Sequence, residues 1–321
     1  MFERLSRSRA RSAQPAINDL QDHSAATRTA VGELLSTMYP VRGMPHGGLE
    51  LILFAGNYAA TPFGVHRGFE HAFLCHIGPG NKRFPLWSPE HYQTVTGSLD
   101  DVLVNWEWLL EHAIDLTLKP GDMLYLPAQW FHIGIQDEYS VSVAIGLYDW
   151  GIDRWAPTAM KSFFERLTPQ ARMPYMPPSS TGNPFRDVVE EPLDLAIRPA
   201  LVAAADDSWF WRVSYGGFTK DESMAPPVPI RREDHVRLVS PCRVCWTEPP
   251  GGRMAIYLRY RKVTVGHHPS LAPFFRRINT SDTIPVADLL DTAQDWSESS
   301  ALELISLLVS TGGLSVVERR P

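Results

Sequence analysis

Between residues 49 and 148 the sequence is a series of short apolar or alternating runs. They are separated by Gly, Pro and Asp, and they read LELILFAG, HAFLCHI, KRFPLW, IDLTL, DMLYLP and YSVSVAIGLY. Each run has the length of a strand and is too short for an ordinary helix. Many short strands with turn residues between them predict an all-β unit, such as a closed barrel.

The rest of the chain has a different texture. Residues 25–38 space their apolar side chains as a helix does, and a second helix is expected inside the β-region at 98–112, with Ser98 as its N-cap. After a Pro-rich stretch at 224–234, residues 236–248 and 253–265 are strand-like. Three helices are then expected near 269–277, 285–293 and 299–310.

These textures predict a mostly β protein with some helix, made of four segments. They are an N-terminal helical segment at 1–48, a barrel core at 49–150, a helical connector at 151–234 and a small winged-helix-like domain at 235–321. A chain of 321 residues is long enough for more than one domain.

The composition narrows the function classes. A net charge of −6 gives no broad basic face, which argues against nucleic acid as a partner. Three cysteines are too few for a disulfide framework, and no apolar run approaches the ~20 residues of a membrane span. The sequence therefore predicts a cytoplasmic protein that is not bound to a membrane.

One segment combines turn residues with a histidine at a fixed distance. It reads GDMLYLPAQWFH, in which Gly121 is followed after five residues by Pro127 and after four more by His132. In a small barrel this arrangement turns the chain, forms one strand, turns again at the proline and points the imidazole inward.

A second segment lies upstream, and the two together resemble a known family. The sequence GNYAATPFGVH ends at His66 and is followed by a strand and by the turn Gly80-Asn-Lys82-Arg. With GDMLYLPAQWFH, this pattern resembles the bacterial Jumonji C and cupin-like oxygenases over about residues 50–148.

The resemblance implies a double-stranded β-helix that binds iron(II) and uses 2-oxoglutarate and dioxygen. By position, His66 and His132 would be the two imidazole ligands. Lys82 would pair with the distal carboxylate of 2-oxoglutarate, and Thr61, Tyr58 and Asn57 would supply hydrogen bonds to it. Two neutral imidazoles and one carboxylate on one face of iron(II) leave room for a keto acid and oxygen, which is the chemistry such a site needs.

The chain departs from the family at the third ligand. Gly68 stands two residues after His66, where the family has a carboxylate. Glu70 is the first replacement, because on an extended strand it shares the face of His66. His71 is a second one and would need a bulge, and a third option leaves the position empty, as in iron halogenases.

The expected function is hydroxylation of a protein, a peptide or a carrier-bound amino acid, with His66, Glu70 and His132 as catalytic metal ligands. Two alternatives stay open: a halogenase or cosubstrate-independent dioxygenase with an altered ligand set, and a non-catalytic binding or scaffold protein. The C-terminal domain would handle a polypeptide or a second subunit, so that a homodimer is also compatible with the sequence.

Overall fold

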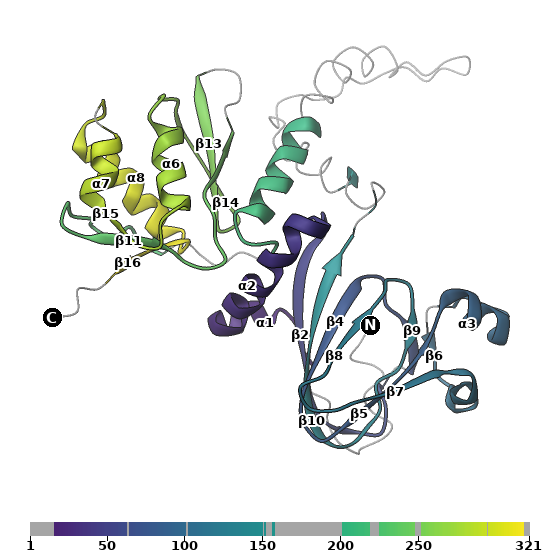
Figure 1. Ribbon diagram of the computed structural model, residues 1–321. Coiled ribbons are helices and arrows are strands. Elements are labelled where there is room, and N and C mark those ends of the chain that lie inside the picture. The colour runs from purple at the N-terminus through teal and green to yellow at the C-terminus, as the bar shows by residue number, and fades with distance from the viewer. Residues whose placement is uncertain are drawn as a thin grey trace, which may run out of the picture. The chain divides into compact units, whose positions relative to one another are not determined.

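The fold is taken from a computed structural model, which describes residues 16–62, 64–100, 102–149, 151, 156–157, 201–218, 225–247, 252–293 and 295–317. The chain divides into two compact units, one formed mainly by residues up to Asp149 and the other mainly by residues from Trp150 onward. Figure 1 shows strands dominating the first unit and helices α6, α7 and α8 in the second. Within the described residues, no helix is both long enough and apolar enough to span a bilayer.

The first unit contains two five-stranded antiparallel sheets. One has the order β1-β2-β10-β4-β8. Its strands are β1 (Ala16–Ile17), β2 (Gly48–Tyr58), β10 (Gln136–Tyr148), β4 (His71–Pro79) and β8 (Met123–Leu126). The helices α1 (Leu20–His23) and α2 (Ala25–Arg42) lie between β1 and β2 in the chain.

The second sheet has the order β6-β3-β9-β5-β7. Its strands are β6 (Val102–Leu103), β3 (Val65–Arg67), β9 (Phe131–His132), β5 (Lys82–Trp87) and β7 (Ile114–Leu118). All six runs identified in the sequence are strands, so the prediction that these runs form β-sheets is confirmed. Apolar and polar residues alternate along these runs because successive side chains of a strand point to opposite sides of the sheet.

The inner faces of the two sheets meet in a hydrophobic cluster. Ala72 and Leu74 from β4 pack there with Phe84 and Leu86 from β5, and Leu118 and Leu126 complete the buried set. This cluster fills one part of the space between the sheets. Polar side chains of the same inner faces occupy another part, described below.

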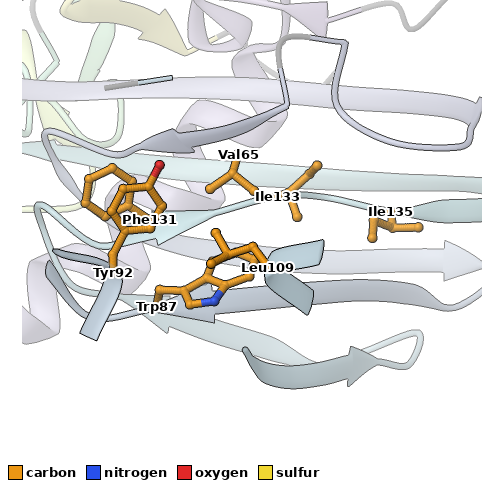
Figure 2. Packing of buried hydrophobic residues seen from close by; sticks show 7 residues of the cluster. All are labelled: Val65, Trp87, Tyr92, Leu109, Phe131, Ile133 and Ile135. Atoms are coloured by element: carbon orange, nitrogen blue, oxygen red, sulfur yellow. The ribbon is translucent and has the colours of Figure 1, made fainter. Parts of the chain in front are cut away.

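The outer face of the second sheet carries its own core. It consists of Val65, Trp87, Tyr92, Leu109, Phe131, Ile133 and Ile135. Figure 2 shows the rings of Tyr92 and Phe131 lying one over the other, and their centroids are 3.6 Å apart with nearly parallel planes. Tyr92 belongs to α3 (Pro89–Thr96) and Leu109 to the 3₁₀ helix η2 (Glu107–His112), so both helices cover this face.

The helix expected at 98–112 is wrong as a single element. The α-helix comes earlier, at α3, and the later stretch forms β6 and η2. Ser88 is the true N-cap, because its side chain accepts a hydrogen bond from the His91 amide, and Pro89 follows at the first helical position. Gly97, with φ of 73°, ends the helix.

Among its described residues, the second unit contains two three-stranded sheets and, after them or between their strands, the helices α6, α7 and α8. The strands are β11 (His235–Leu238), β12 (Cys245–Thr247), β13 (Arg253–Leu258), β14 (Arg261–Gly266), β15 (Ile284–Pro285) and β16 (Leu314–Val317). The sheet orders are β15-β11-β16 and β12-β13-β14. The helices α6 (Leu271–Asn279), α7 (Val286–Thr292) and α8 (Glu298–Ser310) confirm the three helices predicted from periodicity.

The stretch 253–265 is a hairpin and not one strand. The chain reverses between β13 and β14 at Arg259 and Tyr260, which have φ of 49° and 61°. Such a two-residue turn normally uses Asn and Gly, so the sequence carries no obvious turn signal here. The helical connector expected at 151–234 lies mostly outside the described residues, although residues 201–213 are helical.

Candidate metal and keto-acid site

Two histidines from neighbouring strands face each other across a ladder. His66 of β3 is directly opposite His132 of β9, and their ring centroids are 4.1 Å apart. His132 is also opposite Leu86 of β5 and stacks on Phe84, with centroids 5.3 Å apart. Because residues directly opposite in a ladder share a face, both imidazoles lie on the inner side of the sheet.

The hydrogen bonds of the two rings define where their protons are. His66 Nδ1 lies 3.1 Å from the Gly64 carbonyl, and His132 Nδ1 lies 3.4 Å from the Trp130 carbonyl. A carbonyl oxygen only accepts, so Nδ1 carries the proton and the lone pair is on Nε2. This is the tautomer that ligates a metal through Nε2.

Both imidazoles are held in the neutral form. Burial lowers the pKa of His66 to about 4, although its bond to the Gly64 carbonyl opposes the shift. Burial, followed by the proximity of His66, keeps the pKa of His132 well below its usual range. A metal therefore displaces no proton from either ring near neutral pH.

A buried lysine lies on the same inner face. Lys82 of β5 is 2% exposed, and its Nζ donates a hydrogen bond of 3.0 Å to Tyr58 Oη. Burial lowers the pKa of Lys82 to about 8, and its charge contributes to the low pKa of His132. Within the described residues Lys82 forms no ion pair, so its ammonium group suits an anionic ligand.

Gly134 brings two further groups together. A Cβ built on Gly134 would lie 3.2 Å from Lys82 Cε and 3.4 Å from Thr61 Oγ1. Thr61 is buried, and its hydroxyl oxygen accepts a hydrogen bond of 3.1 Å from the Gly134 amide. Lys82, Tyr58 and Thr61 are thus gathered in one place, whereas Asn57 is exposed and alternates to the other face of β2.

Gly68 occupies the position from which a third ligand would reach the imidazoles. Its amide donates to the Trp130 carbonyl, which continues the ladder of β3 and β9 and places position 68 on the face of His66. A Cβ built there would lie 3.3 Å from His132 Cε1. The family's carboxylate position therefore faces the histidines, and in this chain it has no side chain.

Glu70 is not brought to the histidines. Strand β3 ends at Arg67 and its backbone pairing extends only to Gly68, so the strand parity that would align Glu70 with His66 is lost before residue 70. The Glu70 side chain lies instead over Gly146 of β10, whose Cβ would be 3.5 Å from Glu70 Cγ. Burial, and after it the nearby charge of Glu50, raises the pKa of Glu70.

His71 is occupied elsewhere. Its Nδ1 accepts a hydrogen bond from the Ala128 amide and a second one, of 2.8 Å, from Tyr125 Oη. Among the described residues, no three His, Cys, Asp or Glu side chains gather closely enough to hold a metal ion. The donor set thus fits a metal held by two imidazoles and lacks a third protein ligand.

The sequence analysis missed a polar pair near Glu70. Glu50 of β2 accepts a hydrogen bond of 2.7 Å from Tyr148 Oη. The charge of Glu70 contributes to the raised pKa of this tyrosine. Glu50 has the parity of Tyr58 on β2, which is the signal that could have placed it on the inner face. These groups border the space between the sheets on the side of β10.

Comparisons with known proteins agree with this geometry. Residues 52–154, about a third of the chain, match the sequence model of the JmjC domain. Among curated proteins, no sequence matches the chain. The resemblance to the Jumonji C family is thus confirmed for the segment that contains both histidines and Lys82.

Solved structures of YcfD from Escherichia coli are similar in fold. One has a TM-score of 0.56 at 16% sequence identity and covers 94% of this chain and 78% of YcfD. Another is described as a ribosomal oxygenase in complex with cobalt and 2-oxoglutarate. It has a TM-score of 0.53 at 16% sequence identity and covers 89% of this chain and 74% of the YcfD chain. At this identity the likeness extends to the fold alone.

Proposed function

We propose that this protein, whose residues 52–154 are a JmjC domain, is an iron(II)- and 2-oxoglutarate-dependent oxygenase that acts on a protein substrate. The observation that carries the proposal is the pairing, on one inner face, of two neutral imidazoles with a buried lysine that has no carboxylate partner among the described residues. Metal and keto acid are the two ligands that such a combination suits.

The residues of the chain have separate tasks in this proposal. His66 and His132 would hold the metal through Nε2, with each ring oriented by its Nδ1 bond to a backbone carbonyl. Lys82 would pair with the distal carboxylate of 2-oxoglutarate, and Tyr58 and Thr61 would orient it. When bound, iron(II) with 2-oxoglutarate and dioxygen supplies the oxidation: one C–H becomes C–OH while the keto acid becomes succinate and carbon dioxide.

Burial contributes to the same chemistry. Lys82 is buried and His132 is half-buried between the two sheets, beside the apolar cluster of Phe84 and Leu86, which limits the water around the lysine. In such surroundings the attraction between Lys82 and a carboxylate is stronger than in water. A keto acid that spans Lys82 and the metal would be held at both ends.

A protein substrate is supported by the YcfD structures, one of which is described as a ribosomal oxygenase. A carrier-bound amino acid and a homodimer remain further options. The four segments expected from the sequence are proposed as domains, with a winged-helix-like unit at 235–321 that handles the polypeptide. Strand β14 supports this role, because among the described residues it pairs only with β13 and is an edge strand.

Anaerobic titration of the purified protein with iron(II), with and without 2-oxoglutarate, tests the proposal. A metal-to-ligand charge-transfer band that requires both ligands, and that is lost in His66→Ala, is expected. Tight iron binding without a band would point to a cosubstrate-independent enzyme. No metal binding would favour the non-catalytic scaffold.

A further inference from the structure

A pocket of about 420 Å³ opens beside the end of strand β14, inside the second unit. Its walls are mostly apolar and come from Val265 of β14, Leu271 of α6, Leu304 of α8 and Trp296. The Trp296 ring is held edge-to-face against His268, with the ring centroids 5.6 Å apart. A pocket with this volume and lining suits a large apolar side chain.

The edge of β14 next to this pocket is unpaired among the described residues. The sheet order is β12-β13-β14, so β14 is the last strand. The His267 amide donates to the Gly252 carbonyl. Because peptide groups alternate in direction along a strand, the amides and carbonyls of Gly266 and Thr264 point away from β13. Both residues are exposed, so an extended chain could hydrogen-bond to them and continue the sheet.

The two faces of β14 differ in character. Val265 lies opposite Met254 of β13, which is fully buried. Gly266 lies opposite Arg253, which is exposed. Residues directly opposite each other share a face, so Arg253 belongs to the face that Val265 does not use. A strand added to β14 would present every second side chain to the apolar face and the others to the face of Arg253.

The charges along β14 favour an acidic partner. Residues 253–281, which include β13, β14 and α6, contain six Arg or Lys and no Asp or Glu, in a chain whose net charge is −6. Salt bridges to Asp207 and Asp288 occupy two of these cations. Arg253 forms no ion pair within the described part of the chain. Acidic side chains on its face would therefore be attracted.

The acidic residues of the pocket region belong to its other wall. Asp295 precedes Trp296, and Glu298 begins α8, where it is paired with Arg232 at 3.1 Å. Like charges repel, so a carboxylate is disfavoured at this wall and favoured along β14. The group that suits the pocket itself is thus apolar.

We propose that the pocket at the end of β14 is a docking site for an extended segment of the protein substrate in which apolar and acidic residues alternate. The segment adds to β14 as a further strand, with one large apolar side chain in the pocket and its acidic side chains on the face of Arg253. This inference rests on the proposed function, because it takes the partner to be the protein substrate.

Fluorescence anisotropy of labelled peptides with the full-length protein tests this inference without metal or turnover. The peptides have the sequence TEVEXEVET, in which X is Phe, Leu or Ala. The Phe and Leu peptides should bind, and the Ala peptide should bind at least about 10-fold more weakly, because it lacks the large apolar side chain that is buried. Equal affinities for the three peptides would overturn the inference.

Ser300 and Ser299 provide a matched pair of variants. Both are exposed in the first turn of α8, and both hydroxyls bond to that of Ser297, but only Ser300 lines the pocket. Ser300→Trp should obstruct the pocket and weaken the Phe peptide at least about 10-fold. Ser299→Trp should leave its affinity near that of the wild type. The same loss in both variants would contradict the docking site.

Arg253→Glu tests the acidic half of the pattern. It should weaken the Phe peptide several-fold at low salt and less at high salt, because salt screens exposed charges. Arg276→Glu makes the same change on an exposed residue in the last turn of α6, away from the pocket, and should have a smaller effect. Equal effects would argue against acidic side chains on the face of Arg253.

The outcomes separate this inference from the proposed function. A wild type that forms the iron and 2-oxoglutarate band but binds none of the peptides would overturn the inference and leave the proposed function intact. Peptide binding without metal binding would support the docking site while the proposed function fails. If Ser300→Trp converts a dimer into a monomer in sedimentation analysis, a second copy of this chain is the occupant and the inference is overturned. The wild-type peptide series decides the matter if Ser300→Trp does not fold.

Discussion

The two faces of the sheet β6-β3-β9-β5-β7 are built from adjacent residues and have opposite characters. Val65, Phe131 and Trp87 face outward into an apolar core, while His66 and His132 face inward as neighbours across a ladder. One-residue alternation is enough to separate stability from chemistry, because successive side chains of a strand point to opposite sides. Substitutions at adjacent positions should therefore have unrelated effects.

The largest effect is expected from removing an inner histidine. His132→Ala leaves one imidazole for the metal, and cobalt(II) affinity should fall by at least about 100-fold. The fold should survive, because His132 belongs to neither apolar cluster and only its stacking on Phe84 is lost. Isothermal titration measures the affinity, and thermal unfolding without metal provides the control, where a melting temperature close to that of the wild type is expected.

The adjacent residue should show the reverse pattern. Phe131→Ala opens a cavity beneath Tyr92 and removes the ring stacked on it, so the free energy of unfolding should fall by roughly 3–5 kcal/mol. The protein that remains folded should bind cobalt with an affinity near that of the wild type. Urea denaturation measures the first quantity. A loss of cobalt affinity as large as in His132→Ala would break the separation of the two faces.

Lys82→Met tests the inner face without touching the metal ligands. Loss of a charge-assisted bond worth about 1.5–3 kcal/mol should weaken 2-oxoglutarate binding by roughly 10-fold to 100-fold. Cobalt affinity in the absence of keto acid should not fall, because the charge of Lys82 disfavours a cation at His132. Because a buried, unpaired ammonium is replaced by an apolar side chain, the free energy of unfolding should stay equal or rise.

The pKa of Lys82 gives the same contact a pH dependence. Burial lowers this pKa from 10.5 to about 8 in the free protein, and a carboxylate binds the protonated form. The affinity for 2-oxoglutarate should therefore be constant below about pH 7.5 and should decline by about 10-fold per pH unit well above pH 8. A series of titrations between pH 6.5 and about pH 9.5 checks this, and the slope should vanish in Lys82→Met.

The smallest effect is expected on the outer side of β2. Asn57→Ala should leave 2-oxoglutarate binding unchanged, because Asn57 is exposed on the face opposite Tyr58. Tyr58→Phe, which removes the hydroxyl that Lys82 contacts, should weaken binding several-fold, in line with about 0.5–1.5 kcal/mol for one hydrogen bond. Equal effects of the two substitutions would contradict the assignment of faces.

The strands and the two histidines could be predicted from the sequence because both depend on local pattern. The alternation of β2, β4 and β10 fixes their faces, and the spacing from Gly121 to His132 fixes the direction of the imidazole. The resemblance also led to Lys82, Tyr58 and Thr61, which the fold brings together around Gly134. Asn57 does not join this group, because it lies on the face of β2 opposite to Tyr58.

The predictions that the structure corrected depend on where a strand or helix ends and on its tertiary contacts. Glu70 was paired with His66 by assuming that β3 continues, but the strand stops at Arg67. The helix assigned to Ser98 ignored Ser88 and Pro89, a stronger start signal ten residues earlier. The hairpin at Arg259 and Tyr260 uses residues that rarely form such turns, so local propensity could not show it.

A crystal structure of the protein grown with cobalt(II) and 2-oxoglutarate, with anomalous data collected at the cobalt edge, tests the central claim most directly. The account predicts one anomalous peak within bonding distance of Nε2 of both His66 and His132, no carboxylate of the chain bound to it, and the distal carboxylate of the keto acid on Lys82. A peak between Glu50 and Glu70, or a keto acid that leaves Lys82 unpaired, would contradict it.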